Sequence, residues 1–355
     1  MTPLDRVQRV LRGERVDRVP FTTYENKITP CQTERELRNE GLCIVQRSPS
    51  ICRHASPNVT TRRIHYVEND VAYVRTDVHT PKGDLFSVAR PAEGTTWHEK
   101  RLFQGPGDYA ALEFMIRDRQ VLPNYDAFRR AQREVGGDVF LRASIDGYSP
   151  LQEIIICLMG VEQFAVEWSE RRDEVMRLYD AITARRRESY RIAAESPAEQ
   201  VAYGGNITSE VIGLERFERF VLPHYDECAQ VLHAHGKQLC VHLDGNCRLL
   251  ADAIGRSQID CVEAFTPYET DMTLAEARQA WPNKILWINF PSSVHLAEDE
   301  VIAQTTRRIL REAVPGDRLL IGITENVPPD TWQRSFAAIS RTLNQEGRLP
   351  LAYLP

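Results

Sequence analysis

The sequence contains no apolar run long enough to cross a membrane. Its longest candidate, IIICLMGV at residues 154–161, is far shorter than the run of about 20 apolar residues that a spanning helix needs. The opening MTPLDRVQRVLRG has no apolar signal-peptide core and is instead typical of an amphipathic helix, with Thr2 as its N-cap. We therefore expect a cytoplasmic protein that does not associate with membranes.

Paired cysteine motifs and an excess of positive charge are also missing. The 355 residues include 8 cysteines but no CxxC pair, a distribution typical of reduced thiols and not of a disulfide framework. The formal net charge of −6 argues against a surface that binds nucleic acid. With 42% hydrophobic and 26% charged residues, the chain has the composition of a globular protein with a substantial core.

The order of predicted elements indicates an α/β protein. From residue 135 onward, short β-rich runs alternate with longer helix-like runs, a pattern typical of parallel strands joined by helical crossovers. The β-rich runs are VFLRASIDG, QVAYGGN, QLCVHLDGN, CVEAFTP, ILWINFP and LLIGITENV, and RVPFTTYE and GLCIVQR precede them. Eight parallel strands favour a single domain over residues 1–355, a TIM-type (β/α)8 barrel with an N-terminal helix.

A doubly wound open sheet is the rival architecture. It has little support, because no GxGxxG follows the first predicted strand and no GxxxxGK[ST] phosphate loop occurs in the sequence. Residues 64–104 lack the strand–helix alternation of the barrel and of the open sheet. They alternate apolar and polar residues around turns at PKGD and AEGT. This segment predicts an antiparallel β-hairpin insertion.

Polar residues follow most of the predicted barrel strands. Catalytic groups of such barrels come from the carboxyl ends of the strands, so these residues are candidates for the active site. We predict catalytic roles for Glu25, Asp146, His242 and Asp244. The residues predicted to bind substrate are Asn26, Tyr148, Ser149, Asn206 and Asn289.

The stretch VHLDGN, residues 241–246, carries the clearest chemistry. His242 and Asp244 leave the same face of a strand because they are two residues apart. Imidazole nitrogen and carboxylate oxygen are both zinc ligands, and Glu263 or Glu325 could complete the shell. The alternative is that His242 and Asp244 hydrogen-bond each other and organise a pocket without a metal.

A helix start follows Asp146. The run YSPLQE offers Ser149 as the N-cap and Pro150 as the first helical residue. Exposed amides at such an end can hold an anionic group of a substrate. The other interpretation is that this is simply how a helix begins.

With these motifs, the sequence resembles the uroporphyrinogen decarboxylase superfamily, which includes corrinoid-linked methyltransferases. The resemblance runs nearly from end to end. It rests on TPLDRVQRVLRGERVDRVP, DGYSPLQEIIICLMGVEQF, GGNITSEVIGLERFERFVLPHY, GKQLCVHLDGN, IDCVEAFTP, WPNKILWINFPSS and GITENVPPDTW. It implies a distorted (β/α)8 barrel.

The sequence departs from both known branches. The resemblance implies an arginine-rich segment after the first strand in true uroporphyrinogen decarboxylases, but FTTYENKITPCQ has Lys27 as its only cation. The methyltransferase branch carries zinc on a His-x-Cys pair with a further cysteine. Here His242 matches, Asp244 replaces the cysteine, and GITENVP offers no thiol. The implied shell of oxygen and nitrogen ligands is harder than a thiolate-rich one.

The leading hypothesis is a corrinoid-linked methyltransferase. A divalent metal, with zinc as first choice, would bind to His242, Asp244 and either Glu263 or Glu325, and a methyl group would move between a small molecule and cobalamin on a partner protein. One alternative is a metal-free decarboxylase or lyase that acts on a small carboxylate, with His242 and Asp244 as an acid–base pair. The other is a binding protein that has lost catalysis. The family resemblance also suggests a homodimer.

Overall fold

The computed structural model describes residues 1–92, 95–268 and 272–352. Contacts group the chain into two compact units. The first comprises residues 1–51, 125–144 and 196–355, and the second comprises residues 52–124 and 145–195. Whether these units make one domain, as the sequence predicts, stays a prediction.

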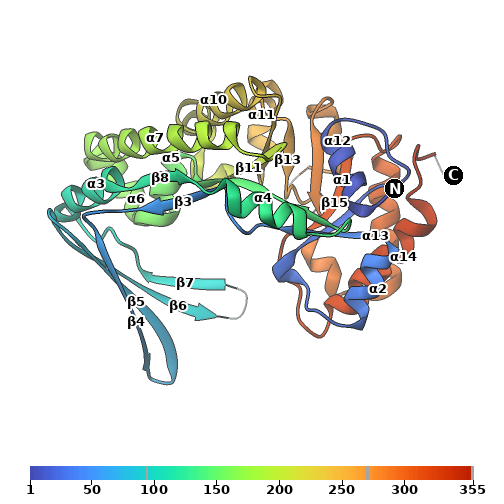
Figure 1. The fold of residues 1–355 in the computed structure, drawn as a ribbon, viewed down its shortest axis with the longest axis horizontal. Helices are drawn as coiled ribbons and strands as arrows, with labels where there is room; N and C mark the ends of the chain where they lie inside the picture. Colours follow the sequence, from blue (N-terminus) through green and yellow to red (C-terminus); the bar gives the residue numbers. More distant parts are fainter. Residues whose placement is uncertain (93–94, 269–271, 353–355) are drawn as a thin grey trace. The chain divides into compact units, whose positions relative to one another are not determined.

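A parallel sheet of nine strands organises the first unit (Figure 1), and the division between the two units falls within its strand β10 (Ala143–Tyr148), after Ser144. In spatial order the strands are β10 (Ala143–Tyr148), β11 (Gln200–Gly204), β12 (Gln238–His242), β13 (Cys261–Glu263), β14 (Ile285–Asn289), β15 (Leu319–Ile323), β1 (Phe21–Tyr24), β2 (Leu42–Gln46) and β9 (Val139–Leu141). Arg142 alone separates β9 from β10 in the chain, and these two strands are the ends of the spatial order. The sheet is therefore nearly closed into the α/β TIM-like barrel that the sequence predicts. The eight predicted runs supply nine strands because VFLRASIDG is divided at Arg142.

Helices alternate with these strands, as parallel pairing requires. They are α1 (Pro3–Leu11), α2 (Gln32–Glu40), α4 (Tyr125–Glu134), α8 (Ser209–Ile212), α9 (Leu214–Phe220), α10 (Leu222–His233), α11 (Ala251–Arg256), α12 (Leu274–Ala280), α13 (Asp299–Glu312) and α14 (Trp332–Glu346). The short 3₁₀ helices η1 (Glu25–Lys27), η4 (Arg248–Leu250) and η5 (Ser292–Leu296) follow β1, β12 and β14. Thr2 caps α1 as predicted, because its hydroxyl accepts a hydrogen bond from the Asp5 amide at 3.1 Å.

One part of the core of the first unit forms where α1 meets the barrel strands. Val7, Val10 and Leu11 of α1 belong to one buried cluster with inward-facing residues of the strands. Cys240 and Cys261 occupy this cluster and are fully buried. All eight cysteines of the chain are free thiols, in agreement with the expectation from their spacing.

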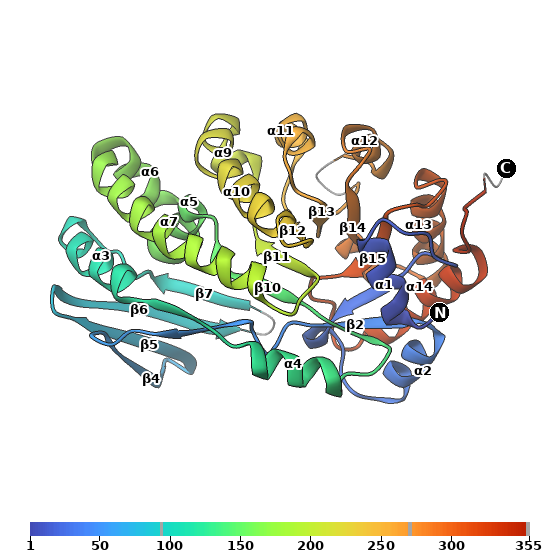
Figure 2. The ribbon, with the colours of Figure 1, turned by 45° about the horizontal axis from the view of Figure 1, so that its top comes forward.

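The second unit contains two antiparallel sheets and a set of helices (Figure 2). β3 (Cys52–Ala55) pairs with β8 (Gln120–Pro123). A four-stranded sheet consists of β4 (Thr60–Glu68), β5 (Val71–Thr80), β6 (Gly83–Ala92) and β7 (Thr95–Lys100). The remaining elements are η2 (Pro106–Asp108), α3 (Tyr109–Asp118), α5 (Pro150–Glu153), the π-helix η3 (Ile154–Met159), α6 (Val161–Glu170) and α7 (Arg172–Glu195).

The antiparallel insertion predicted for residues 64–104 is confirmed, although its strands begin at Thr60 and end at Lys100. Glu93 and Gly94 of the predicted AEGT turn lie outside the described residues. None of the helices in the described part of the chain combines the length and apolar character needed to cross a membrane.

A buried histidine makes the stability of the first unit depend on pH. His295 is 2% exposed, its Nδ1 lies 2.6 Å from the Ser335 hydroxyl, and its ring contacts Phe290 and Phe336. Burial lowers the pKa of His295 to about 4. Between about pH 6.5 and 4 the unfolded chain binds a proton that the folded chain does not, so stability falls as the pH is lowered.

We expect this residue alone to reduce the free energy of unfolding by about 2 kcal/mol between about pH 7 and pH 5. Urea unfolding of the wild type and of His295→Gln at both pH values measures the contribution. The variant should show a smaller difference between the two conditions. An equal difference in both proteins would show that His295 does not stay neutral in the folded state.

Candidate active site

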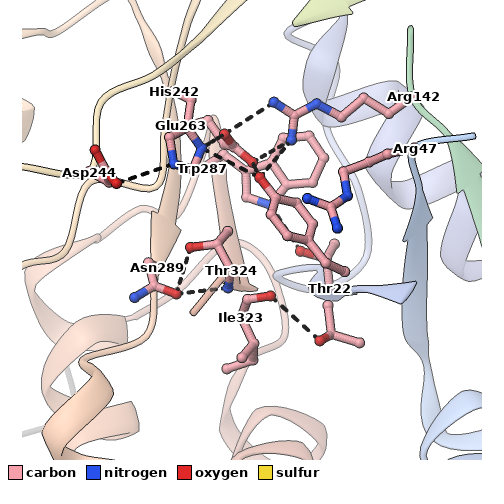
Figure 3. Close-up of polar contacts among 12 residues, drawn as sticks. Thr22, Arg47, Arg142, His242, Asp244, Glu263, Trp287, Asn289, Ile323 and Thr324 are labelled. Carbon is pink, nitrogen blue, oxygen red and sulfur yellow. Dashed lines mark hydrogen bonds and ion pairs between the residues drawn. The ribbon is translucent and has the colours of Figure 1, made fainter. Parts of the chain in front are cut away.

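His242 and Glu263 end two neighbouring strands and face each other. β12 and β13 pair in parallel, with His242 in register with Glu263. Nδ1 of His242 lies 2.6 Å from Oε2 of Glu263, within hydrogen-bond distance (Figure 3). One ring nitrogen of the histidine is therefore occupied by a carboxylate from the next strand.

Glu263 is fully buried and is surrounded by donors. Its Oε1 accepts hydrogen bonds from the Tyr24 hydroxyl and from Nη1 of Arg142, and its Oε2 accepts a second bond from Nη2 of Arg142 at 3.1 Å. Burial by itself favours the neutral acid, but Arg142 and His242 outweigh it and hold the pKa of Glu263 far below its usual range. Glu263 is thus an ionised carboxylate whose charge a bidentate arginine compensates.

The second ring nitrogen of His242 faces Asp244. Nε2 of His242 lies 3.5 Å from Oδ2 of Asp244, and the two side chains are 16% and 26% exposed. Burial opposes the charged imidazolium, yet Glu263 and Asp244 together raise the pKa of His242 to about 10. At neutral pH both ring nitrogens of His242 are therefore protonated, and the ring is a charged imidazolium, when no metal competes for Nε2.

Glu325, which follows β15, joins this pair. One ligand atom each from His242, Asp244 and Glu325 lies within 4.8 Å of the other two. The sequence allows Glu263 or Glu325 as the third ligand. The geometry favours Glu325, because both oxygens of Glu263 accept hydrogen bonds from Tyr24, Arg142 and His242.

This donor set fits a divalent metal. One imidazole nitrogen and two carboxylate oxygens are ordinary ligands for zinc, and three protein ligands leave a position for substrate or water. Metal-bound histidines regularly pass their other ring N–H to a carboxylate, which fixes the orientation of the ring. Glu263 occupies that place beside His242.

Glu25 and Asn26 hold an arginine. Oε2 of Glu25 accepts a hydrogen bond from Nε of Arg47 at 3.1 Å, and Oδ1 of Asn26 accepts one from Nη2 of Arg47 at 2.8 Å. The neighbouring Lys27 donates from Nζ to Asn326 at 2.5 Å. The predicted catalytic residue Glu25 thus contacts Arg47, and its own role in catalysis stays a prediction.

Asn289 has a structural function that accounts for its polarity. Its Oδ1 accepts hydrogen bonds from the Thr324 amide and hydroxyl at 2.9 and 3.0 Å, and its Nδ2 donates to the hydroxyls of Thr266 and Ser292. These bonds connect the ends of β14 and β15 with the loops beside them (Figure 3). Both hydrogens of its Nδ2 are therefore used within the protein, and the predicted role of Asn289 in substrate binding stays a prediction.

Two glycines allow the loops around His242 to approach closely. A Cβ on Gly205 would lie 1.8 Å from the carbonyl oxygen of His242, and a Cβ on Gly245 would lie 2.3 Å from the carbonyl oxygen of Ile207. Asn206, predicted to bind substrate, donates its backbone amide to the same His242 carbonyl at 3.2 Å. The GGN and DGN motifs therefore position the end of β12.

We expect Gly205→Ala to displace His242 and to lower the free energy of unfolding by about 1–3 kcal/mol, because the clash is with backbone. Thermal melting and metal analysis of the purified variant measure both effects. Gly107→Ala is the matched control, since no atom lies within 4 Å of its Cβ position. If Gly205→Ala melts at the same temperature as the wild type, the loop adjusts to the added methyl group without strain.

Three predicted site residues belong to the second unit. Oδ2 of Asp146 accepts a hydrogen bond from Nη2 of Arg119 at 2.9 Å and lies 3.1 Å from Nε2 of His54. Although burial opposes ionisation, His54 and Arg119 lower the pKa of Asp146. Asp146 is therefore an ionised member of a local charge cluster, and the predicted catalytic and binding roles of Asp146 and Tyr148 stay predictions.

Ser149 occupies the N-cap position of α5 and Pro150 is the first helical residue, as predicted. The expectation that the serine side chain caps the helix is wrong. Its hydroxyl is fully buried and makes no hydrogen bond to the helix or to any other described residue. α5 spans only four residues before the π-helix begins, so the start of this segment is not an ordinary helix terminus.

The residues that sequence reasoning missed are Tyr24, Arg47 and Arg142. Arg142 had a usable signal, because it is the one charged residue in the otherwise apolar start of VFLRAS. It follows Phe140 by two residues and so shares its inward face. Tyr24 and Arg47 lie at the ends of β1 and β2 without a comparable pattern.

The chain belongs to the uroporphyrinogen decarboxylase (URO-D) family, whose model matches residues 2–345. This confirms the resemblance seen in the sequence. A methyltransferase from Methanosarcina mazei is similar in structure, with a TM-score of 0.60, 11% sequence identity, and 97% of this chain and 99% of that chain covered. A B12-independent methionine synthase from Shewanella sp. W3-18-1, in complex with selenomethionine, has a TM-score of 0.47 at 9% identity, with 88% of this chain and 86% of that chain covered. No curated protein sequence matches the chain. The family and the Methanosarcina protein are both named for enzymes, a decarboxylase and a methyltransferase.

Proposed function

We propose that this protein is a metal-dependent methyltransferase of the corrinoid-linked type. His242, Asp244 and Glu325 would hold a divalent metal, with zinc as the first candidate. The observation that carries the proposal is the pair of contacts on one imidazole. Nδ1 of His242 lies 2.6 Å from buried Glu263, while Nε2 faces Asp244, which groups with Glu325.

Arg142 makes this arrangement compatible with a metal. A metal on Nε2 requires His242 to lose a proton, which removes a positive charge from beside Glu263. Arg142 contacts both oxygens of Glu263 and remains in place, so the buried carboxylate keeps a compensating cation. The imidazole can then donate its Nδ1–H to Glu263 and direct Nε2 toward Asp244 and Glu325.

A metal in this position would act as a Lewis acid that polarises a heteroatom of the substrate. The protein itself would hold the metal through one nitrogen and two oxygens and would orient the imidazole through Glu263. A shell without thiolate favours oxygen or nitrogen as the substrate heteroatom. We propose that the methyl group on this heteroatom moves to or from cobalamin on a partner protein, as the resemblance to the corrinoid-linked branch suggests.

Metal analysis of protein purified without an affinity tag tests the proposal. We expect about one divalent ion per chain in the wild type, and a loss of at least about 10-fold in metal affinity for Glu325→Gln. Asp252→Asn is the matched control, because Asp252 is exposed and makes no hydrogen bond or ion pair with the described side chains. A wild-type protein that binds no divalent metal, even after metal is added, would contradict the metal-dependent function.

One observation favours a second candidate, a metal-free lyase or decarboxylase for a small carboxylate. Without a metal, the pKa of His242 is raised to about 10, so the imidazolium could act as a general acid beside Asp244. In that case His242→Gln should abolish turnover of the carboxylate, and chelators should leave the wild-type rate unchanged. Inhibition by chelators that added zinc reverses would exclude this candidate.

A further inference from the structure

Two arginines lie against the ring of Tyr24, and they differ in how their hydrogen-bond donors are used. The guanidinium carbon of Arg142 is 5.6 Å from the ring centroid, and that of Arg47 is 4.1 Å from it. Both Nη atoms of Arg142 donate to Glu263, and its side chain is 5% exposed. Nη1 also donates to the Tyr24 hydroxyl at 2.9 Å, so both terminal nitrogens of Arg142 are engaged within the protein.

Arg47 is held in place but has an open edge. Nε donates to Glu25 and Nη2 donates to Asn26, while the guanidinium stacks on Tyr24. Its side chain is 36% exposed, and Nη1 makes no hydrogen bond to any residue in the described part of the chain. A guanidinium that is fixed on three sides loses little conformational entropy when it binds a further group.

Arg47 also lies next to the proposed metal ligands. In Figure 3 the side chains of Arg47, which follows β2, and Arg142 lie near each other, and both extend toward the residues around Glu263. The hydroxyl of Tyr24 is 3.5 Å from Nδ1 of His242, and the ring of the same tyrosine carries Arg47. The length of one tyrosine side chain thus separates the imidazole from the guanidinium.

A second cation lies beside Arg47. Lys27 donates from Nζ to Asn326, and an ammonium group has three donors in all. Burial lowers the pKa of Lys27, the charge of Glu325 opposes this shift, and the charge of Arg47 adds to it. Lys27 therefore adds positive charge within electrostatic range of both groups.

We propose, on the basis of the proposed function, that Arg47 is a specificity-determining residue that binds a carboxylate of the substrate. The substrate would be a small molecule that carries a metal-binding heteroatom at one end and a carboxylate at the other. Nη1 of Arg47 donates to the carboxylate, and Lys27 supports it electrostatically. Glu25 and Asn26 act indirectly, because they orient Arg47.

Competing thiols on the cobalt-loaded protein test this inference. Mercaptopropionate and mercaptopropanol have the same chain length and the same metal-binding thiol, but only the first carries a carboxylate. Thiolate binding to cobalt produces a charge-transfer band that can be titrated without an assay of turnover. A charge-assisted hydrogen bond predicts that the wild type binds mercaptopropionate roughly 10-fold to 100-fold more tightly than mercaptopropanol.

Arg47→Met should remove this preference and leave the affinity for mercaptopropanol unchanged. Arg47→Lys should retain part of it, because the positive charge is kept. Arg15→Met is the matched control, since Arg15 is exposed, precedes β1 in the chain and makes no hydrogen bond or ion pair with the described side chains.

The outcomes separate the two proposals. If cobalt and both thiols bind but the preference is absent from the wild type or persists in Arg47→Met, the carboxylate assignment is wrong and the metal site stands. If neither cobalt nor thiol binds to the wild type, the metal-dependent function itself fails.

Discussion

Replacing Arg142 with methionine is expected to lower the free energy of unfolding by about 3–5 kcal/mol, which is the usual effect of breaking a buried ion pair from one side. Glu263 is fully buried, and Arg142 contacts both of its oxygens. Methionine fills similar space but leaves the carboxylate with only Tyr24 and His242 as partners. We therefore expect a lower urea midpoint and a lower melting temperature.

The double variant Arg142→Met/Glu263→Leu distinguishes an uncompensated charge from a simple loss of packing. Removing both charges relieves the unpaired carboxylate, so the double variant should be more stable than Arg142→Met alone. It should not reach wild-type stability, because Tyr24 and His242 lose the oxygens that they contact. If Arg142→Met unfolds within about 1 kcal/mol of the wild type, Glu263 is not charged in the folded protein.

The fold could be predicted from the sequence because parallel barrel strands have a strong local pattern. Runs such as ILWIN are apolar throughout, and β14 is buried at every position. Helical crossovers connect β14 to its neighbours β13 and β15, as parallel pairing requires. The division of VFLRASIDG into β9 and β10 could not be foreseen, because it depends on which strand each half meets: β9 pairs with β2, whereas β10 lies beside β11.

The candidate site could be predicted only in part. The rule that catalytic groups follow barrel strands selects His242, Asp244, Glu263 and Glu325, and the structure brings these four together, while their functions stay predictions. The rule treats every polar residue at a strand end alike, although the Asn289 side chain is fully used in hydrogen bonds within the protein. An asparagine that fastens two strand ends and an asparagine that binds substrate look the same in a sequence, because only the hydrogen-bond partners differ.

The roles of Glu263 and Arg47 required three-dimensional information for a different reason. Whether a glutamate binds metal or supports a ligand depends on which of its oxygens are already bonded, and Arg142 decides this for Glu263. Arg142 comes about 120 residues earlier in the chain, a separation that no local pattern detects. Arg47 likewise depends on η1, the 3₁₀ helix that places Glu25 and Asn26 beside it.

Asp244→Asn is expected to reduce metal affinity and any metal-dependent turnover by at least roughly 100-fold without unfolding the protein. Asp244 is 26% exposed, and its contact with His242 is long at 3.5 Å, so its change should alter the free energy of unfolding by no more than about 0.5 kcal/mol. His242→Ala should abolish the same activity and also lower stability by about 1.5–3 kcal/mol, because the 2.6 Å contact with ionised Glu263 is lost.

The double variant His242→Ala/Asp244→Asn tests whether the two residues act on one ligand. If they do, it should be no less active than His242→Ala alone, since groups that act as a unit are not additive. Metal content, turnover and thermal melting should be measured together on all three variants. Asp252→Asn serves again as the control for the loss of one negative charge at an exposed position. Full metal content and normal turnover in the double variant would remove this pair from the active site and direct attention to Glu25 and Asp146.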